Sequence, residues 1–232
     1  LARRRKRNRI LGAVLALSVI AGGVWLAKPD WQQLAKVMTP YSESRELEQG
    51  MLLLEEYAQL TKPDQLNQAS EHIERVLAHT PEKAEAVAAM AYIYLQRYQS
   101  GQRDEVWMQK AKASTQQALK LDANLAMTQV VNARLLQWQH ELTKALAAAE
   151  LSIRVAPEGI LGWHAKMSIL LEMGRQDEAI EFALKGEKLF PKDRYMLDLA
   201  AGIYLANGRF AELESVLKKS LERQPEGQLA YP

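Results

Sequence analysis

The apolar residues of this chain follow one pattern near its start and a different pattern in the rest. Residues 10–27, ILGAVLALSVIAGGVWLA, contain neither a charged residue nor a proline. From about residue 50 onward, apolar side chains instead recur three or four positions apart, as on one face of a helix. One such stripe consists of Leu53, Leu54, Tyr57 and Leu60. The sequence therefore predicts one continuously apolar helix followed by a series of amphipathic helices.

A constant period runs through the C-terminal part of the chain. The stretches MGRQDEAIEFALKGEKLFP and NGRFAELESVLKKSLERQP begin at positions 173 and 207 and place glycine, arginine, glutamate and proline in register. Pro157, Pro191 and Pro225 are equally spaced at the same interval. Small residues recur 12 positions before the prolines or their counterparts, namely Ala69, Ala111, Ala145 and Ala179, and Leu213 before Pro225 is the exception. A fixed period of about 34 residues indicates one supersecondary unit used several times.

Each unit is predicted to be a pair of helices that buries its apolar face only by stacking on the next pair. Gly174 and Gly208 mark the turn within a pair, and the small residues allow two helices to approach closely. The predicted units are 50–83, 84–125, 126–159, 160–193 and 194–227, and a tail follows at 228–232. The second unit carries eight extra residues near Gly101. These would lengthen its first helix or form a loop, with Trp107 as a lid or packed on the neighbouring unit.

This pattern resembles the tetratricopeptide repeat, in which W-x₂-L-G-x₂-Y is followed by A-x₃-F and a proline. The fourth unit matches it with Trp163, Met167, Leu170, Ala179, Ala183 and Pro191. The fifth matches it with Leu197, Ala201, Tyr204, Leu213, Leu217 and Pro225. No unit matches completely, and the late aromatic residue is missing throughout. The resemblance covers about residues 50–227 and implies an all-α solenoid of about five helical hairpins.

The N-terminal pattern indicates a membrane segment. Residues 1–9, LARRRKRNR, carry six basic residues and no acidic one. As a helix, residues 10–27 would be about 27 Å long, close to the hydrocarbon thickness of about 30 Å. The basic flank predicts a single-pass helix with a cytoplasmic N-terminus in the inner membrane of a bacterium, and a repeat domain in the periplasm. Residues 28–49 are predicted to form a juxtamembrane linker.

Two other interpretations of this segment remain open. A cleaved signal peptide is one of them, because Ala21, Gly22 and Gly23 could form a small-residue cleavage site. A buried helix of a soluble protein is the other. Small residues four positions apart, such as Gly12 and Ala16, would also allow a homodimer through the membrane helix.

Composition argues against several kinds of chemistry. The chain has no cysteine, which excludes disulfides, thiolate metal sites and a cysteine nucleophile. Outside residues 1–9, 24 basic residues face 28 acidic ones, so the net charge of +2 becomes −4 and no basic face for nucleic acid is indicated. None of the four histidines has the spacing of a zinc site, and no phosphate-binding, dinucleotide-binding or nucleophile motif occurs. We therefore expect no enzymatic activity, no metal and no cofactor.

The resemblance suggests where a partner would bind. In tetratricopeptide arrays the first helices of successive units line a concave groove, and that geometry implies a binding surface of Tyr92, Arg134, Gln137, Trp138, His164, Tyr195 and Asp198, with Glu85 also facing inward. Arg134 and Trp138 lie four residues apart on one helix face. An arginine beside an aromatic residue suits a peptide carboxylate or an extended segment. Packing of Trp138 on the next unit is the alternative.

We therefore expect a membrane-anchored, extracytoplasmic scaffold that binds a protein or peptide partner in the assembly of a secretion, pilus or wall complex. The chain also resembles the C-terminal portion of bacterial membrane-spanning Ser/Thr kinases and winged-helix regulators, on the stretches QASEHIERVLAHTPEKAEAVAAMAYIYL and QQALKLDANLAMTQ. That resemblance implies a sensory half whose cytoplasmic domain lies upstream of Leu1. A secreted periplasmic chaperone is the third interpretation.

Overall fold

The computed structural model describes residues 40–60, 62–101, 103–191, 193 and 195–223. The predicted basic flank 1–9, membrane helix 10–27, tail 228–232 and the greater part of the linker 28–49 lie outside these residues. Within the described residues, no helix combines the length and apolar character that a membrane span needs. The contacts divide the chain after Ser42, and the architecture below is that of the unit beginning at Glu43.

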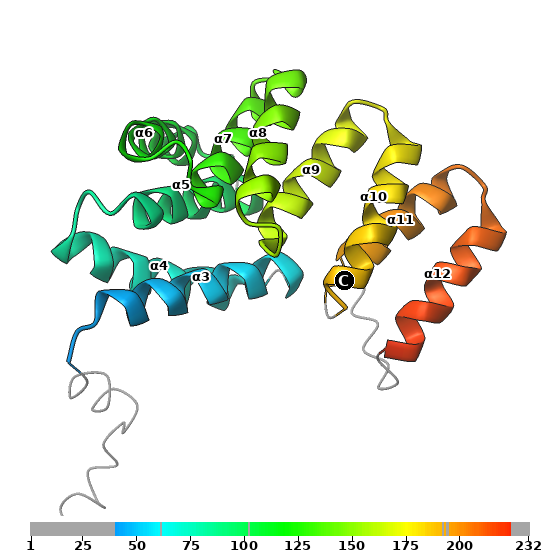
Figure 1. Cartoon of the computed structure of the whole chain (residues 1–232), viewed down its shortest axis with the longest axis horizontal. Coiled ribbons are helices and arrows are strands. Elements are labelled where there is room, and N and C mark those ends of the chain that lie inside the picture. Colours follow the sequence, from blue (N-terminus) through cyan, green and yellow to red (C-terminus); the bar gives the residue numbers. More distant parts are fainter. Residues whose placement is uncertain (1–39, 61, 102, 192, 194, 224–232) are drawn as a thin grey trace, which may run out of the picture. The chain divides into compact units, whose positions relative to one another are not determined.

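All the secondary structure of the described residues is α-helical, as the repeat pattern predicts. In the part of this unit that the structure describes, ten helices follow one another (Figure 1). In chain order they are α3 (Glu43–Leu60), α4 (Pro63–His79), α5 (Ala84–Ser100), α6 (Glu105–Leu121), α7 (Ala126–Trp138), α8 (Leu142–Val155), α9 (Ile160–Glu172), α10 (Gln176–Leu189), α11 (Tyr195–Ala206) and α12 (Phe210–Arg223). Each odd-numbered helix packs on the even-numbered helix that follows it, so they form five pairs.

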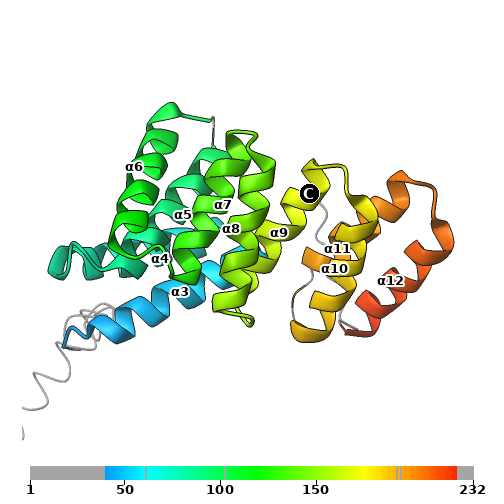
Figure 2. The same cartoon turned by 45° about the horizontal axis from the view of Figure 1, so that its top comes forward.

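The pairs stack in the order of the chain. The second helix of each pair contacts the first helix of the next pair, and α5 and α7 also contact the first helices on both sides of them. Figure 2 shows α7 and α8 side by side, followed by α9. Each pair therefore covers its apolar face with the next pair, as a helical solenoid requires.

A residue with positive φ marks the turn within four of the pairs. It lies two positions before the second helix: Arg103 (φ 54°), His140 (φ 58°), Gly174 (φ 73°) and Gly208 (φ 67°). His140, Gly174 and Gly208 are separated by the same interval as the three periodic prolines. In these four pairs the left-handed residue keeps the same place before the second helix, and it is glycine in the last two of them.

The second pair absorbs its eight extra residues mainly by lengthening its helices. Helix α5 has 17 residues against 13 in α7, and α6 has 17 against 14 in α8. These differences account for four and three residues, and the connection within the pair is one residue longer. Trp107 stacks on Tyr94 of its own pair at 5.7 Å between ring centroids, a contact that the sequence did not predict. Arg97 and Lys110 lie over the Trp107 ring, so cation–π contacts hold it there.

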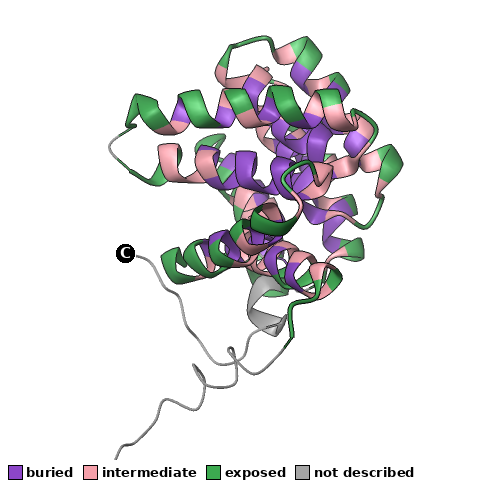
Figure 3. Cartoon of the chain, turned by 90° about the vertical axis from the view of Figure 1, so that its left-hand side faces the viewer, coloured by how far each residue is buried: buried purple, intermediate pink, exposed green. Residues whose placement is uncertain are grey.

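The periodic small residues lie where helices meet. Ala69, Ala111, Ala145 and Ala179 are fully buried. Figure 3 shows buried residues on the helix sides that face other helices and exposed residues on the outward sides. The prediction that small residues permit close packing of the helices is therefore confirmed.

One contact goes beyond simple stacking. Helix α3 of the first pair also contacts α9 of the fourth pair. The contact joins two first helices that are not consecutive, since α5 and α7 come between them along the chain. The spacing of residues in the sequence did not predict it. Helix α3 begins at Glu43, inside the range 28–49 assigned to the linker. The side chains of Thr80 and Lys83 bind its Glu43 carboxylate at 2.6 and 3.2 Å, which fixes this start against the connection between α4 and α5.

Candidate functional site

A hollow of about 280 Å³ lies among the first helices of all five pairs. We call it the central hollow, and its lining residues are Tyr57, Ala58, Tyr92, Gln96, Gln99, Arg134, His164, Ser168 and Tyr195. Helix α3 reaches it because α3 contacts α9. The hollow thus occupies the place that the tetratricopeptide resemblance assigns to a binding groove.

Arg134 gives the central hollow its charge. It is the one lysine or arginine among the described lining residues, and none of them is a carboxylate. Its Nη1 donates to Oε1 of Gln137 at a long 3.4 Å, while its buried Nε–H has no hydrogen-bond partner in the described structure. An unsatisfied buried donor is unfavourable, so a ligand oxygen that reached this guanidinium would remove that cost.

Tyr57, Tyr92 and Tyr195 line the central hollow together with Arg134. Burial raises the pKa of Tyr92 to about 12, the nearby charge of Arg134 opposes that shift, and Tyr57 and Tyr195 add to it. Burial also raises the pKa of Tyr57. The phenols of Tyr57 and Tyr92 therefore stay protonated at neutral pH and can act as hydrogen-bond donors to an anion beside Arg134.

His164 is held in place by Asp193, which does not itself line the hollow. Its Nε2–H donates to Oδ2 of Asp193 at 2.7 Å, and both side chains are almost fully buried. Oδ1 of the same carboxylate accepts the backbone N–H of Tyr195, the first residue of α11, at 3.0 Å. The His164 and Tyr195 rings lie 4.3 Å apart between centroids. Asp193 thus fixes two lining residues and ties the fourth pair to the fifth.

The structure brings together four of the seven residues predicted for the groove and places three elsewhere. Tyr92, Arg134, His164 and Tyr195 line the central hollow. Gln137 instead bridges α7 to α9, since its Nε2 donates to Ser168 and Glu172 at 2.9 Å each.

Trp138 and Asp198 also lie outside the lining. Trp138 packs on the second pair, with its ring edge-on to Tyr98 at 5.2 Å and the guanidinium of Arg103 5.7 Å above it. Asp198 is exposed on α11, and Glu85 lies on α5 with Lys83 3.8 Å away. Trp138 therefore packs on a neighbouring unit, but on the preceding one and not on the next one, which was the predicted alternative.

Sequence reasoning missed Tyr57, Ala58, Gln96, Gln99 and Ser168. Gln96 and Gln99 follow Tyr92 by four and seven residues, so helical spacing alone could have placed them on the same face of α5. Tyr57 was assigned to the apolar stripe of its helix, and it is indeed only 5% exposed. Its place at the hollow depends on the contact between α3 and α9, which spacing within one helix does not contain.

The other histidines take part in local contacts. His72 lies 2.7 Å from a carboxylate oxygen of Glu46, His79 bonds to the backbone oxygen of Arg75, and His140 lies 3.1 Å from Glu172. In the part of the chain that the structure describes, no three histidine or acidic side chains are grouped as a metal site requires.

Solved structures of other proteins, one of them named as a TPR (tetratricopeptide-repeat) protein, share this fold. PilW, a widely conserved type IV pilus biogenesis factor, aligns over 82% of this chain and 81% of its own with a TM-score of 0.58 and 18% identity. TTC0263, a thermophilic TPR protein of Thermus thermophilus, aligns over 82% and 96% with a TM-score of 0.56 and 19% identity. PilF of Pseudomonas aeruginosa aligns over 80% and 79% with a TM-score of 0.54 and 18% identity.

No protein-family model matches the sequence, and no curated protein matches it either. Identities this low concern the fold alone. For the described residues, the comparisons confirm the predicted helical-hairpin solenoid of the tetratricopeptide type.

Proposed function

We propose that this chain is a protein-binding scaffold whose central hollow holds an extended segment of a partner and pairs one of its carboxylates with Arg134. The observation that carries the proposal is the lining itself: five pairs contribute, one guanidinium is present, and no carboxylate is. A charge-assisted, two-pronged contact to a carboxylate would satisfy the guanidinium. The phenols of Tyr57, Tyr92 and Tyr195 would add hydrogen bonds and contact area, as aromatic anchors do in many interfaces.

The setting that we propose is the bacterial cell envelope. Residues 10–27 would anchor the chain in the inner membrane, with the repeat unit in the periplasm, and the six basic residues before them motivate this orientation. Assembly of a secretion, pilus or wall complex is the proposed process. The shared fold of PilW, a pilus biogenesis factor, is compatible with that choice. No reaction is assigned to the chain.

The proposal is tested by photocrosslinking in living cells with the full-length chain. A photoreactive amino acid at Gln99, an exposed lining residue, should capture a discrete envelope protein. Gln117, an equally exposed glutamine on α6 outside the hollow, is the matched control position and should not. Adding Arg134→Gln should reduce the capture at Gln99 at least tenfold, because the amide keeps hydrogen bonding but loses the charge.

Three results would count against the proposal. Equal capture from Gln99 and Gln117 would mean that the hollow does not select the partner. Capture that is unchanged by Arg134→Gln would mean that pairing of a partner carboxylate with Arg134 does not contribute to binding. Self-crosslinks in place of a partner would favour the sensory alternative, in which two copies transmit a signal to a cytoplasmic domain.

A further inference from the structure

A second hollow lies on the other side of α9. We call it the outer cleft; its volume is about 300 Å³, and Glu150, Ile153, Arg154, Trp163, Lys166, Phe182 and Lys185 line it. Helices α8 and α10 provide its walls. On α9, Trp163 and Lys166 face the outer cleft, while His164 and Ser168 face the central hollow. The two hollows therefore occupy opposite faces of one helix and are separate sites.

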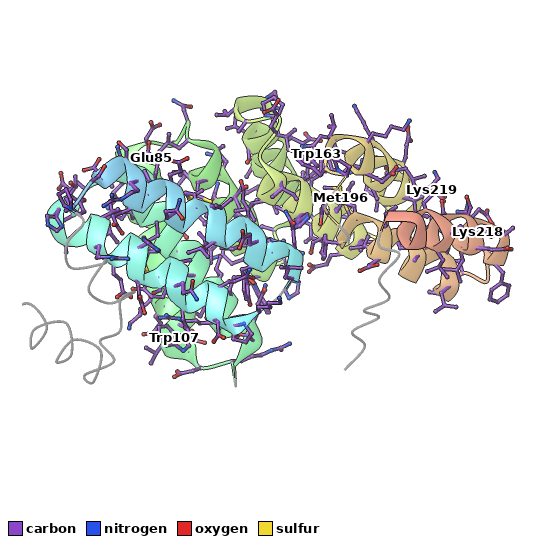
Figure 4. All side chains as sticks on the ribbon, turned by 90° about the horizontal axis from the view of Figure 1, so that it is seen from below. Glu85, Trp107, Trp163, Met196, Lys218 and Lys219 are labelled. Carbon is purple, nitrogen blue, oxygen red and sulfur yellow. The ribbon has the colours of Figure 1, made fainter. Side chains whose placement is uncertain are left out.

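The floor of the outer cleft is aromatic and apolar. The Trp163 and Phe182 rings are stacked at 4.3 Å between centroids with 16° between their planes. The indole N–H donates to the backbone oxygen of Pro157 at 2.9 Å, so it has no hydrogen bond left to offer a ligand. Figure 4 shows Trp163 near Met196 of α11, where the fourth pair meets the fifth. Contacts on both sides thus hold the floor rigidly in place.

The repeat does not require the Phe182 half of this floor, whereas Trp163 matches the first position of the tetratricopeptide pattern. The residues one period before and after Phe182 are Ala148 and Val216, and those for Trp163 are Gln129 and Leu197. Ala148 and Val216 are both buried, so a small or branched aliphatic residue satisfies the packing of the unit at that place. Phe182 is half-buried and open to the cleft. The paired aromatic rings therefore distinguish this position from its counterparts in the neighbouring units.

The walls of the outer cleft carry excess positive charge. Lys166 is neutralised by Glu150 at 2.8 Å and lies 4.9 Å above the Phe182 ring. Arg154 and Lys185 are exposed, and neither has an ion-pair partner within the described structure. The chain outside residues 1–9 has a net charge of −4, so a generally basic surface does not explain the presence of these two cations at the cleft. An occupant with carboxylates is the electrostatic complement.

We propose that the outer cleft is a second protein-binding site, which takes an acidic segment of a partner and buries one apolar side chain of it against Trp163 and Phe182. The volume lies at the lower limit of ligand pockets, about 300–1,000 Å³, which suits a single side chain better than a cofactor. Carboxylates on either side of that side chain pair with Arg154 and Lys185. This site is independent of the ligand of the central hollow.

The test uses a fluorescein-labelled hexapeptide, Asp-Glu-Phe-Leu-Asp-Glu, and anisotropy titration against the full-length chain in detergent. We expect saturable binding that weakens as salt rises, and at least tenfold weaker binding when the four acids are replaced by lysine or the two apolar residues by alanine. Lys185→Glu and Arg154→Glu should each weaken binding at least fivefold. Lys188→Glu makes the same charge change on an exposed residue of α10 outside the cleft and should alter it less than twofold.

The remaining outcomes would overturn the proposal. Equal losses with Lys185→Glu and Lys188→Glu would reduce the binding to general attraction between opposite charges. Loss with Arg134→Ala but not with Lys185→Glu would place the peptide in the central hollow. Competition by a peptide of residues 224–232 would make the occupant this chain's own end and not a partner. Absence of saturable binding by a chain whose melting temperature is unchanged would exclude the site.

Discussion

The places where helices meet and the turns between helices both recur with the period of the repeat, but they restrict the sequence in different ways. We call the first kind seams, the contacts between neighbouring helices at small residues such as Ala145, Ala179 and Gly186. The turns are the left-handed residues at Arg103, His140, Gly174 and Gly208. A seam restricts the size of a side chain, whereas a turn restricts only the backbone.

At the seams there is no space for a larger side chain. A Cβ atom on Gly50 would lie 2.6 Å from Cδ1 of Ile73, and one on Gly162 would lie 2.8 Å from Oγ of Ser152. On Gly186 it would overlap Sδ of Met196. At the turns the space is open, since nothing lies within 4 Å of a Cβ built on Gly174. Larger residues are therefore tolerated at turns for a modest backbone cost, which explains arginine and histidine there.

The largest effect is expected at the seam between α10 and α11. Gly186→Val would add a branched side chain that overlaps Met196 and approaches Cε3 of Trp163, where even a Cβ would lie 3.1 Å away. Both neighbours are buried. Overpacking of this kind costs typically about 1–3 kcal/mol and occasionally more, and we expect the upper end here. Urea unfolding followed by circular dichroism measures the change.

A double-variant cycle identifies the cause. If contact with Met196 is responsible, Gly186→Val combined with Met196→Ala should lose less stability than the sum of the two single losses. Strict additivity would mean that Met196 is not the obstacle and that the seam is looser than its distances indicate.

A smaller loss is expected at the seam of α8, where an exposed alanine provides a matched control. Ala145 is fully buried, while Ala147 lies two positions further along the same helix and is exposed. Ala145→Leu should lower the free energy of unfolding by about 1–3 kcal/mol, and Ala147→Leu should change it by less than about 0.5 kcal/mol. Equal effects of the two variants would contradict the register of the repeat on this helix.

The next prediction asks whether a polar side chain that lines the central hollow is shielded from water as well as a side chain in a seam. Burial raises the pKa of Tyr92 from 10.0 to about 12. Between these values the unfolded chain loses the phenol proton and the folded chain keeps it, so stability falls as pH rises above 10. Tyr92→Phe should remove up to about 1.4 kcal/mol of this loss for each pH unit. Urea unfolding of both proteins at pH 9 and pH 11 gives the difference; parallel losses would mean that water reaches the phenol.

The sequence predicted the fold well because the repeat concentrates its requirements at a few positions. Small residues at fixed offsets and glycines at turns were sufficient to infer paired helices, since each feature depends on contacts within a pair or with the next one. The same locality explains why Tyr92, Arg134, His164 and Tyr195 come together in one hollow, while their role in binding stays a prediction. All four lie on first helices, and the resemblance orients first helices toward one side.

The sequence predictions differ from the structure where a contact joins helices that are not neighbours along the chain, or where one side chain has two possible partners. The contact of α3 with α9 passes over two whole pairs, and no period encodes it. Gln137 and Trp138 have suitable spacing for a groove, but stronger local partners engage them: Ser168 and Glu172 in one case, and Tyr98 with Arg103 in the other. Which of two available partners a side chain takes depends on distances that sequence spacing does not determine.

A glycine in a turn and a glycine inside a helix, both with open surroundings, separate backbone strain from lack of space. Gly174 has φ 73°, whereas Gly202 lies inside α11, and neither would bring a Cβ within 4 Å of another atom. Gly174→Ala should destabilise the chain by about 1 kcal/mol, because L-residues are strained in the left-handed region. Gly202→Ala should stabilise it by about 0.5–1 kcal/mol through helix propensity. Thermal melting of the pair gives both signs, and the same sign for both would refute the distinction.

The smallest effect is expected at His140, the turn residue that replaces glycine in the third pair. His140→Gly relieves a non-glycine residue at φ 58° but removes its 3.1 Å contact with Glu172. The histidine side chain is 83% exposed, so that contact contributes little. At pH 8 we expect a net gain of about 0.5 kcal/mol in the free energy of unfolding. A net loss would show that the exposed contact outweighs the backbone strain, and that the third turn is maintained by its side chain in a way that the fourth, at Gly174, is not.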